Sequence, residues 1–153
     1  DIPCRADAVV TSCGGFPKDI SLYQGTKTID NVESALKPGG TLVLFIEAPE
    51  GGGPAEYFDW AKDLVAGTIE RRLREHFTVA GYIFFLNCEQ AQRYNILLYS
   101  SIAPEDVAPM GIKAFSDVNA LLDAAQLEGK SIYVIPNGST VIPHVKEASK
   151  HEA

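Results

Sequence analysis

The chain has 153 residues and a formal net charge of −7, from 13 basic and 20 acidic side chains. This charge and the lack of a basic stripe argue against a nucleic-acid partner, because such proteins place Lys and Arg against phosphates. No apolar run approaches the roughly 18–20 residues that a membrane span needs, so we expect no membrane partner either. We interpret residues 1–153 as a single domain, since domains typically have about 100–200 residues.

Three cysteines, Cys4, Cys13 and Cys88, follow neither a zinc-binding nor a disulfide pattern. Their odd number favours a reducing compartment. The chain also opens without a secretory signal pattern, so we expect a cytoplasmic location. Cys13 ends an apolar run and Cys88 lies in an apolar helical pattern, which predicts buried structural thiols at both positions.

The first half of the chain alternates an apolar run with a helical pattern. Residues 6–13 predict a strand, followed by a loop at 14–18 and a helix from about Ile20 to Leu36, with Asp19 as its N-terminal cap. Pro38-Gly39-Gly40 is expected to end this helix. The continuous apolar run 41–48 predicts a second strand, buried on both faces as in a parallel sheet.

The second half continues the alternation after a Gly-rich loop at 50–54. Helical spacing predicts one helix with Tyr57, Trp60, Ala61 and Leu64, one with Ile69, Leu73 and Phe77, and one capped by Ser116 with a buried stripe of Val118, Leu121, Leu122 and Ala125. Residues 79–93 are also expected to form a helix, although the run 82–85 (YIFF) would suit a strand as well. Further strands are expected at 95–101, 112–115 and 131–135. Arg71, Arg72 and Arg74 are interleaved with acidic residues, which indicates a solvated helix face.

Strand–helix alternation with buried strands predicts an α/β fold. We expect an open, mostly parallel sheet of about five strands with helices on both faces, a Rossmann-like three-layer arrangement. Ligands of such sheets bind outside the carboxyl ends of the strands. Two loops, Gly14–Asp19 and Glu47–Ala55, are therefore expected to meet at one edge and form one wall of a cleft.

A polar pair follows the first of these loops. Gln24 and Lys27 lie three residues apart, so they share a helix face opposite the apolar stripe of Leu22, Ile29 and Val32. This spacing fits a pair that is merely exposed to solvent as well as a pair that binds an anion. Gly25 between them favours a special role, because glycine inside a helix costs about 1 kcal/mol relative to alanine.

Residues 14–31 (GGFPKDISLYQGTKTIDN), followed by 37–53 (KPGGTLVLFIEAPEGGG), resemble the C-terminal domain of the nickel-pincer lactate racemase family. The resemblance runs in order over residues 6–60 and is weaker over 81–136. Members of this family racemise or epimerise 2-hydroxy acids by reversible hydride transfer to a nickel-pincer nucleotide. Their acid–base histidines, cofactor-holding lysine and nickel-binding histidine belong to an N-terminal catalytic domain, which would be the partner of this chain.

The resemblance implies roles for particular residues. Gln24 and Lys27 would contact a small 2-hydroxy acid, with Tyr23 beside them; a lysine ammonium suits its carboxylate and a glutamine amide its oxygens. The residues expected to face the cofactor are Gly14, Gly15, Lys18, Asp19, Gly51, Gly52, Gly53 and Tyr82. No catalytic residue or metal ligand is expected in this chain, so the isolated chain should be inactive and carry no bound cofactor.

Two other functions remain open from the sequence. One is a non-catalytic domain that binds a small anion. The other is a methyltransferase-like domain, because KPGGTLVLF resembles a segment of S-adenosylmethionine methyltransferases, although Gly14-Gly15-Phe16-Pro17 is not the GxGxG-type loop that reading needs. His76, His144 and His151 have no carboxylate or second histidine at metal-ligand spacing, and we expect them to be non-catalytic.

Overall fold

The structure is a computed structural model and describes residues 1–146. Its centre is a sheet of five strands in the order β4-β3-β2-β1-β5, and every neighbouring pair is parallel. The strands are β1 Ala6–Ser12, β2 Leu36–Phe45, β3 Asn95–Tyr99, β4 Lys113–Phe115 and β5 Ile132–Ile135. The predicted α/β class and open parallel sheet are confirmed.

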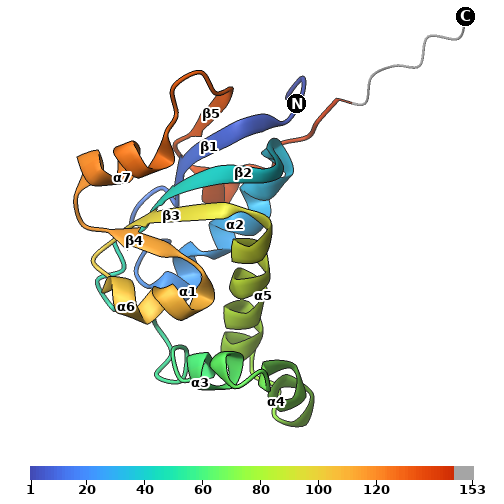
Figure 1. Ribbon diagram of the computed structural model, residues 1–153, viewed down its shortest axis with the longest axis vertical. Helices are drawn as coiled ribbons and strands as arrows, with labels where there is room; N and C mark the ends of the chain where they lie inside the picture. Colours follow the sequence, from blue (N-terminus) through green and yellow to red (C-terminus); the bar gives the residue numbers. More distant parts are fainter. Residues whose placement is uncertain (147–153) are drawn as a thin grey trace, which may run out of the picture.

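Helices cover both faces of this sheet (Figure 1). The α-helices are α1 Leu22–Gly25, α2 Lys27–Val32, α3 Trp60–Val65, α4 Ile69–Glu75, α5 Val79–Arg93, α6 Pro104–Val107 and α7 Val118–Ala125. Short 3-10 turns are η1 Glu33–Ala35, η2 Ala108–Met110 and η3 Gly138–Thr140. The steps from β1 through β4 run in one direction and the step to β5 runs back, so right-handed crossovers place α7 on the face opposite the other helices.

Alternate side chains of the strands divide the core into two parts. On the larger face, Val9 of β1, Leu42 and Leu44 of β2, and Leu98 of β3 pack with α1, α2 and α5. On the smaller face, Val43 and Leu97 pack with Leu121 and Ala125 of α7. The central strands are buried on both faces, and this explains their continuous apolar character.

The predicted helix at 20–36 is interrupted. Ser21, not Asp19, caps α1: its Oγ accepts a hydrogen bond from the Gln24 N–H at 3.4 Å. Asp19 instead uses its backbone carbonyl, which accepts from the Ala48 N–H at 2.9 Å. The helical segment ends at Ala35, before Pro38, and Leu36 already pairs with Ala6 as the start of β2. The pairing of Leu36 with β1 therefore ends the helix, and Pro38-Gly39-Gly40 lies within β2 instead of ending the helix as predicted.

The cap and stripe predicted for α7 also need correction. Asp117, not Ser116, caps this helix, since its carboxylate accepts from the Ala120 N–H at 2.8 Å. Leu121 and Ala125 are buried as predicted, whereas Val118 and Leu122 are 40% and 42% exposed. The reason is that α7 packs on β2, β3 and β4, so side chains that lean away from these strands stay in contact with solvent.

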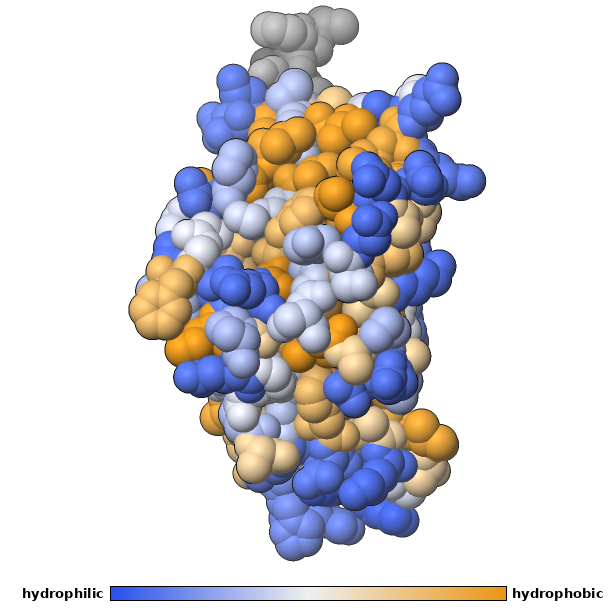
Figure 2. All heavy atoms as spheres, turned by 90° about the vertical axis from the view of Figure 1, so that its left-hand side faces the viewer, coloured by the Kyte–Doolittle hydropathy of each residue, from blue (hydrophilic) through white to orange (hydrophobic). Residues whose placement is uncertain are grey.

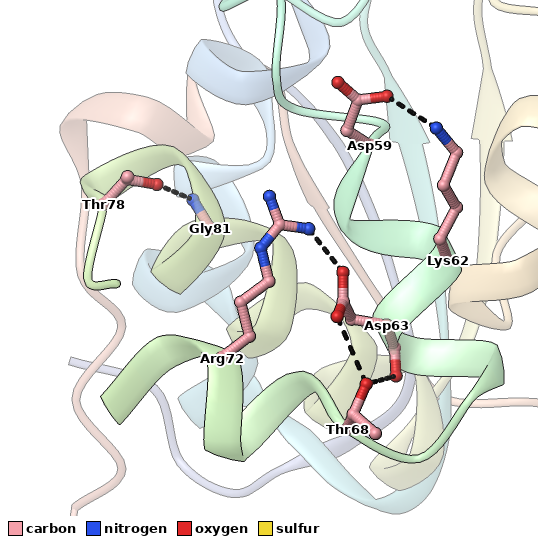
Figure 3. A network of polar contacts seen from close by, with 7 residues as sticks. All are labelled: Asp59, Lys62, Asp63, Thr68, Arg72, Thr78 and Gly81. Atoms are coloured by element: carbon pink, nitrogen blue, oxygen red, sulfur yellow. Dashed lines mark hydrogen bonds and ion pairs between the residues drawn. The ribbon is translucent and has the colours of Figure 1, made fainter. Parts of the chain in front are cut away.

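Helices α3, α4 and the start of α5 form an arm beyond the sheet (Figure 1). Its centre is the buried Trp60, whose ring carries the Arg72 guanidinium at 4.0 Å from the ring centroid. Arg72 also pairs with Asp63, which in turn accepts from the Thr68 hydroxyl at 3.2 Å (Figure 3). The side chain of Arg72 is thus held against the arm, which corrects the prediction that Arg71, Arg72 and Arg74 share a solvated face.

The buried thiols are as predicted: Cys13 is fully buried and Cys88 is 2% exposed, while Cys4 is exposed. Burial raises the pKa of both buried thiols, and that of Cys88 rises to about 12. Among residues 1–146, no helix is both long enough and apolar enough to cross a membrane.

Candidate functional site

The two loops predicted to meet do lie side by side at the carboxyl edge of the sheet. The Ala48 N–H donates to the Asp19 carbonyl and the Glu50 N–H to the Ile20 carbonyl, both at 2.9 Å. The Leu22 N–H donates to Gly51 at 2.9 Å and the Tyr23 N–H to Gly52 at 3.1 Å. The carbonyls of the loop after β2 therefore accept the first N–H groups of α1, and these hydrogen bonds fix the position of the Tyr23–Lys27 segment.

Glycine is required where these loops turn. Gly14 has φ +93°, and a Cβ there would lie 2.7 Å from Oδ1 of Asn137, in the loop after β5. Gly53 has φ +99°, and a Cβ would lie 2.9 Å from Oγ of Ser21. These two glycines serve close packing of the backbone at the edge; a role toward a cofactor stays a prediction.

A small hollow beside α1 and α2 brings the predicted polar pair together. It has a volume of about 240 Å³, and we call it the cationic hollow; its lining residues are Lys18, Gln24, Lys27, Asn31 and Ser139. Lys27 Nζ donates to Gln24 Oε1 at 2.8 Å and lies 4.4 Å from the centroid of the Tyr23 ring. Tyr23, Gln24 and Lys27 thus form one contiguous group, in which the amide oxygen and the ring both face the ammonium.

Two members of this hollow, Asn31 and Ser139, were not predicted as site residues. The Asn31 amide donates to the Gly138 carbonyl at 3.1 Å, and the Ser139 hydroxyl donates to the Cys13 carbonyl at 2.5 Å. Ser139 comes from η3, which follows β5, the strand beside β1. Only the pairing of β5 with β1 brings it here, and no local pattern in the sequence indicates that pairing.

Buried groups hold the ring of Tyr23 from behind. Its centroid lies 6.2 Å from that of Tyr57 in an edge-to-face arrangement, and Tyr57 is fully buried. The Tyr57 hydroxyl donates to Asn87 at 2.9 Å, and a chain of amides continues through Gln90 to Asp30 of α2. Burial raises the pKa of Tyr57, so this hydroxyl stays a neutral donor. The chain ties α2 to α5 and thereby positions the group around Lys27.

The charge of the cationic hollow is unopposed. Lys18 and Lys27 line it, no carboxylate does, and neither lysine forms an ion pair within residues 1–146. This is notable in a chain with a net charge of −7. Two ammonium groups beside amide and hydroxyl groups are suited to bind a small anion.

A second, larger hollow of about 570 Å³ lies at the same edge, and we call it the acidic hollow. Its lining residues are Ser12, Gly15, Asp19, Phe45, Ile46, Glu47, Tyr99, Ser100, Ser101 and Ser116. It contains two carboxylates and no cation. Figure 2 looks onto this edge of the molecule, where residues of intermediate hydropathy occupy the centre and apolar side chains gather at the top. Of the predicted residues, Gly15 and Asp19 belong here rather than to the cationic hollow.

The predicted residue Tyr82 lies apart from both hollows, on α5 in the helical arm. It is 46% exposed, and its ring centroid lies 6.1 Å from that of Phe77. Together they line an apolar hollow of about 440 Å³ whose other lining residues are Glu70, Leu73, Arg74 and Phe85. Within this chain the structure does not bring Tyr82 to Gln24 and Lys27.

Metal-ligand sets and histidines contribute nothing to either hollow. Residues 1–146 contain no group of three or more His, Cys, Asp or Glu side chains placed to hold a metal ion. His76 and His144 are exposed and line neither hollow. His151 lies outside the described residues.

Comparisons with known proteins agree on one family. The profile of the lactate racemase C-terminal domain matches residues 3–143. A curated lactate racemase from Thermoanaerobacterium thermosaccharolyticum is 38% identical over 58 residues, which are 38% of this chain and 14% of that protein. The solved lactate racemase apoprotein from the same species superposes with a TM-score of 0.76 and 25% identity. That superposition covers 95% of this chain and 36% of the solved one.

Proposed function

Because the chain belongs to the lactate racemase C-terminal domain family, we propose that it is the substrate- and cofactor-facing part of a cytoplasmic 2-hydroxy-acid racemase or epimerase. In this proposal an N-terminal catalytic domain of the same protein is its partner. The cationic hollow is the substrate-contacting surface that this chain contributes. The chain spans little more than a third of the solved relative, so the activity of the whole protein is part of the proposal.

The observation that carries the proposal is the arrangement of Gln24 and Lys27. The ammonium of Lys27 has no carboxylate partner among the described residues and donates a hydrogen bond to Gln24 Oε1 at 2.8 Å. A substrate carboxylate would take a second position on this ammonium, and the amide N–H₂ of Gln24 would donate to a hydroxyl or carbonyl oxygen. Tyr23 would hold the lysine chain in place through its ring.

The proposal divides the chemistry between two domains. The hollow offers no histidine for proton transfer, so the acid–base groups are assigned to the partner domain. When bound, the nickel-pincer nucleotide supplies a hydride acceptor. In this proposal the present chain offers charge and hydrogen bonds, and the nickel ligands belong to the partner domain. Gly14, Gly15, Asp19, Gly51–Gly53 and Tyr82 remain the proposed cofactor-facing positions, whereas Lys18 lines the cationic hollow beside the proposed substrate contacts.

The test uses the protein together with its catalytic domain. Gln24→Ala and Lys27→Ala should each lower kcat/KM for the hydroxy acid by about ten- to hundredfold, the loss of a charge-assisted contact of about 1.5–3 kcal/mol. The free energy of unfolding should change by less than about 0.5 kcal/mol, because both side chains are exposed. Lys113→Ala, at an exposed lysine of β4 outside the site, is the matched control and should leave turnover unchanged.

The alternative function is a non-catalytic domain that binds a small anion in the same hollow. It would be supported if Lys27→Ala weakened anion binding while the protein with its partner domain showed no interconversion of hydroxy-acid enantiomers. The 153-residue chain alone should show no racemase activity, even with the nickel cofactor supplied. Measurable interconversion by this chain would contradict the division of chemistry proposed above.

A further inference from the structure

The cationic hollow contains one positive charge more than a monocarboxylate needs. Lys27 alone can pair with the carboxylate of a 2-hydroxy acid, and Gln24 beside it can serve the hydroxyl. Lys18 comes from the loop between β1 and α1 and lines the same hollow. It forms no ion pair within residues 1–146, and its neighbour Asp19 lines the acidic hollow instead.

The other residues that line the hollow point the same way. Asn31 and Ser139 are polar, so each of the five lining residues carries a polar or charged group. The hollow is therefore suited to a second polar group beside the substrate carboxylate.

We infer that the substrate of this site carries a second anionic group, a carboxylate or a phosphate, which binds to the Lys18 ammonium. The inference rests on the proposed function and specifies its substrate class. Lys27 and Gln24 hold the 2-hydroxy-acid end, and Lys18 holds the distal anion. Lys18 is thus a specificity-determining residue, which selects doubly anionic 2-hydroxy acids over lactate.

Binding to the 153-residue chain tests this inference directly. Chemical-shift titrations at low salt would use lactate, malate, 3-phosphoglycerate and inorganic phosphate. Malate or 3-phosphoglycerate should bind about three- to fivefold more tightly than lactate, the effect of one additional exposed ion pair. Whichever binds more tightly identifies the distal group as carboxylate or phosphate. The shifts should appear at Lys18, Gln24 and Lys27.

Two variants separate this inference from the proposed function. Lys18→Ala should bring the ratio of malate or phosphoglycerate affinity to lactate affinity close to one, and Lys113→Ala should leave the ratio unchanged. Lys27→Ala should weaken the binding of lactate, malate and 3-phosphoglycerate alike. Equal weakening of all acids by Lys18→Ala, or no preference for the dianions, would overturn the inference and leave the proposed function standing.

Inorganic phosphate provides the last distinction. If it binds with a strong dependence on Lys18 while the dianionic acids gain nothing over lactate, Lys18 serves a separate phosphate, and the inference is wrong. If Lys27→Ala changes no affinity at all, the proposed function itself fails.

Discussion

The cationic and acidic hollows lie at the same sheet edge, and adjacent residues separate them: Lys18 lines one and Asp19 the other. The acidic hollow is more than twice as large, about 570 Å³ against about 240 Å³, and lies directly above the strand ends. Nevertheless its carboxylates would repel an anionic substrate, whereas the smaller hollow has two ammonium groups that form no ion pair among residues 1–146. We therefore assign the anion to the cationic hollow because of its charge, although it is the smaller of the two.

The segments that line the two hollows meet at a wall of buried contacts. Cys13 Sγ lies 3.4 Å from the Gly25 carbonyl, behind the cationic hollow, and 3.9 Å from the Phe45 carbonyl, beside the acidic one. A Cβ on Gly25 would lie 2.6 Å from the Ile46 side chain. The space that the sequence left unexplained at Gly25 is therefore occupied by Ile46, and α1 packs directly on the end of β2.

The largest effect expected concerns the thiol in this wall. If both hollows are closed toward the core, Cys13 and Cys88 should react with a thiol reagent at least about a thousandfold more slowly than exposed Cys4, since reaction requires an opening that costs several kcal/mol. Burial also raises the pKa of both thiols, and the reactive thiolate becomes scarce. Counting modified thiols over time should give one fast site in native protein and three in urea. Fast labelling of Cys13 would mean that the hollows connect.

The next effect concerns the packing of α1 on β2. Gly25→Ala should lower the free energy of unfolding by about 1–3 kcal/mol, because the added methyl group overlaps Ile46. Urea denaturation would measure it. Ile46→Val provides the control: it removes a methyl group from the crowded position, so it should cost less in the Gly25→Ala background than in the wild type. Independent, additive effects would show that Gly25 and Ile46 are not in contact.

The sequence predicted those parts of the molecule that depend on local patterns. Apolar runs located all five strands, and the spacing of Gln24 and Lys27 placed both on the exposed face opposite Leu22 and Ile29. Local patterns gave the wrong residue where two of them competed. Asp19 and Ser21 are both good caps. The backbone carbonyls of Gly51 and Gly52 accept hydrogen bonds from the first N–H groups of α1, and this position of the helix start decides for Ser21.

The candidate site was predicted less completely, for a topological reason. Ser139 enters the cationic hollow because β5 pairs with β1, and this contact spans more than a hundred residues of sequence. Asn31 lies one helical turn after Lys27 on α2, so helical spacing could have indicated it. Tyr82 shows a different limit of prediction from the sequence. The helix expected at 79–93 is confirmed and places Tyr82 on the arm, but the proposed relation of Tyr82 to the cofactor depends on the proposed partner domain.

Charge reversal in the two hollows is expected to have the next largest effect. Lys27→Glu should weaken lactate binding by about ten- to thirtyfold, because an attraction of about 1 kcal/mol becomes a repulsion of similar size. Glu47→Lys in the acidic hollow should not restore binding when combined with it, since the new charge lies in the other hollow. Chemical-shift titration of both variants would decide. Restoration by the double variant would mean that the hollows act as one site.

The smallest effect tests how independent the two hollows are. Glu47→Gln removes one repulsive charge from the acidic hollow without changing its shape. Glu47 is exposed and lines a different hollow from Lys27, so solvent and salt screen its effect on an anion bound there. Lactate and malate affinities should rise by less than about twofold at physiological salt. They should rise slightly more at low salt, where the screening length is greater. An increase beyond about threefold, independent of salt, would place Glu47 in direct contact with the bound acid and merge the two hollows into one.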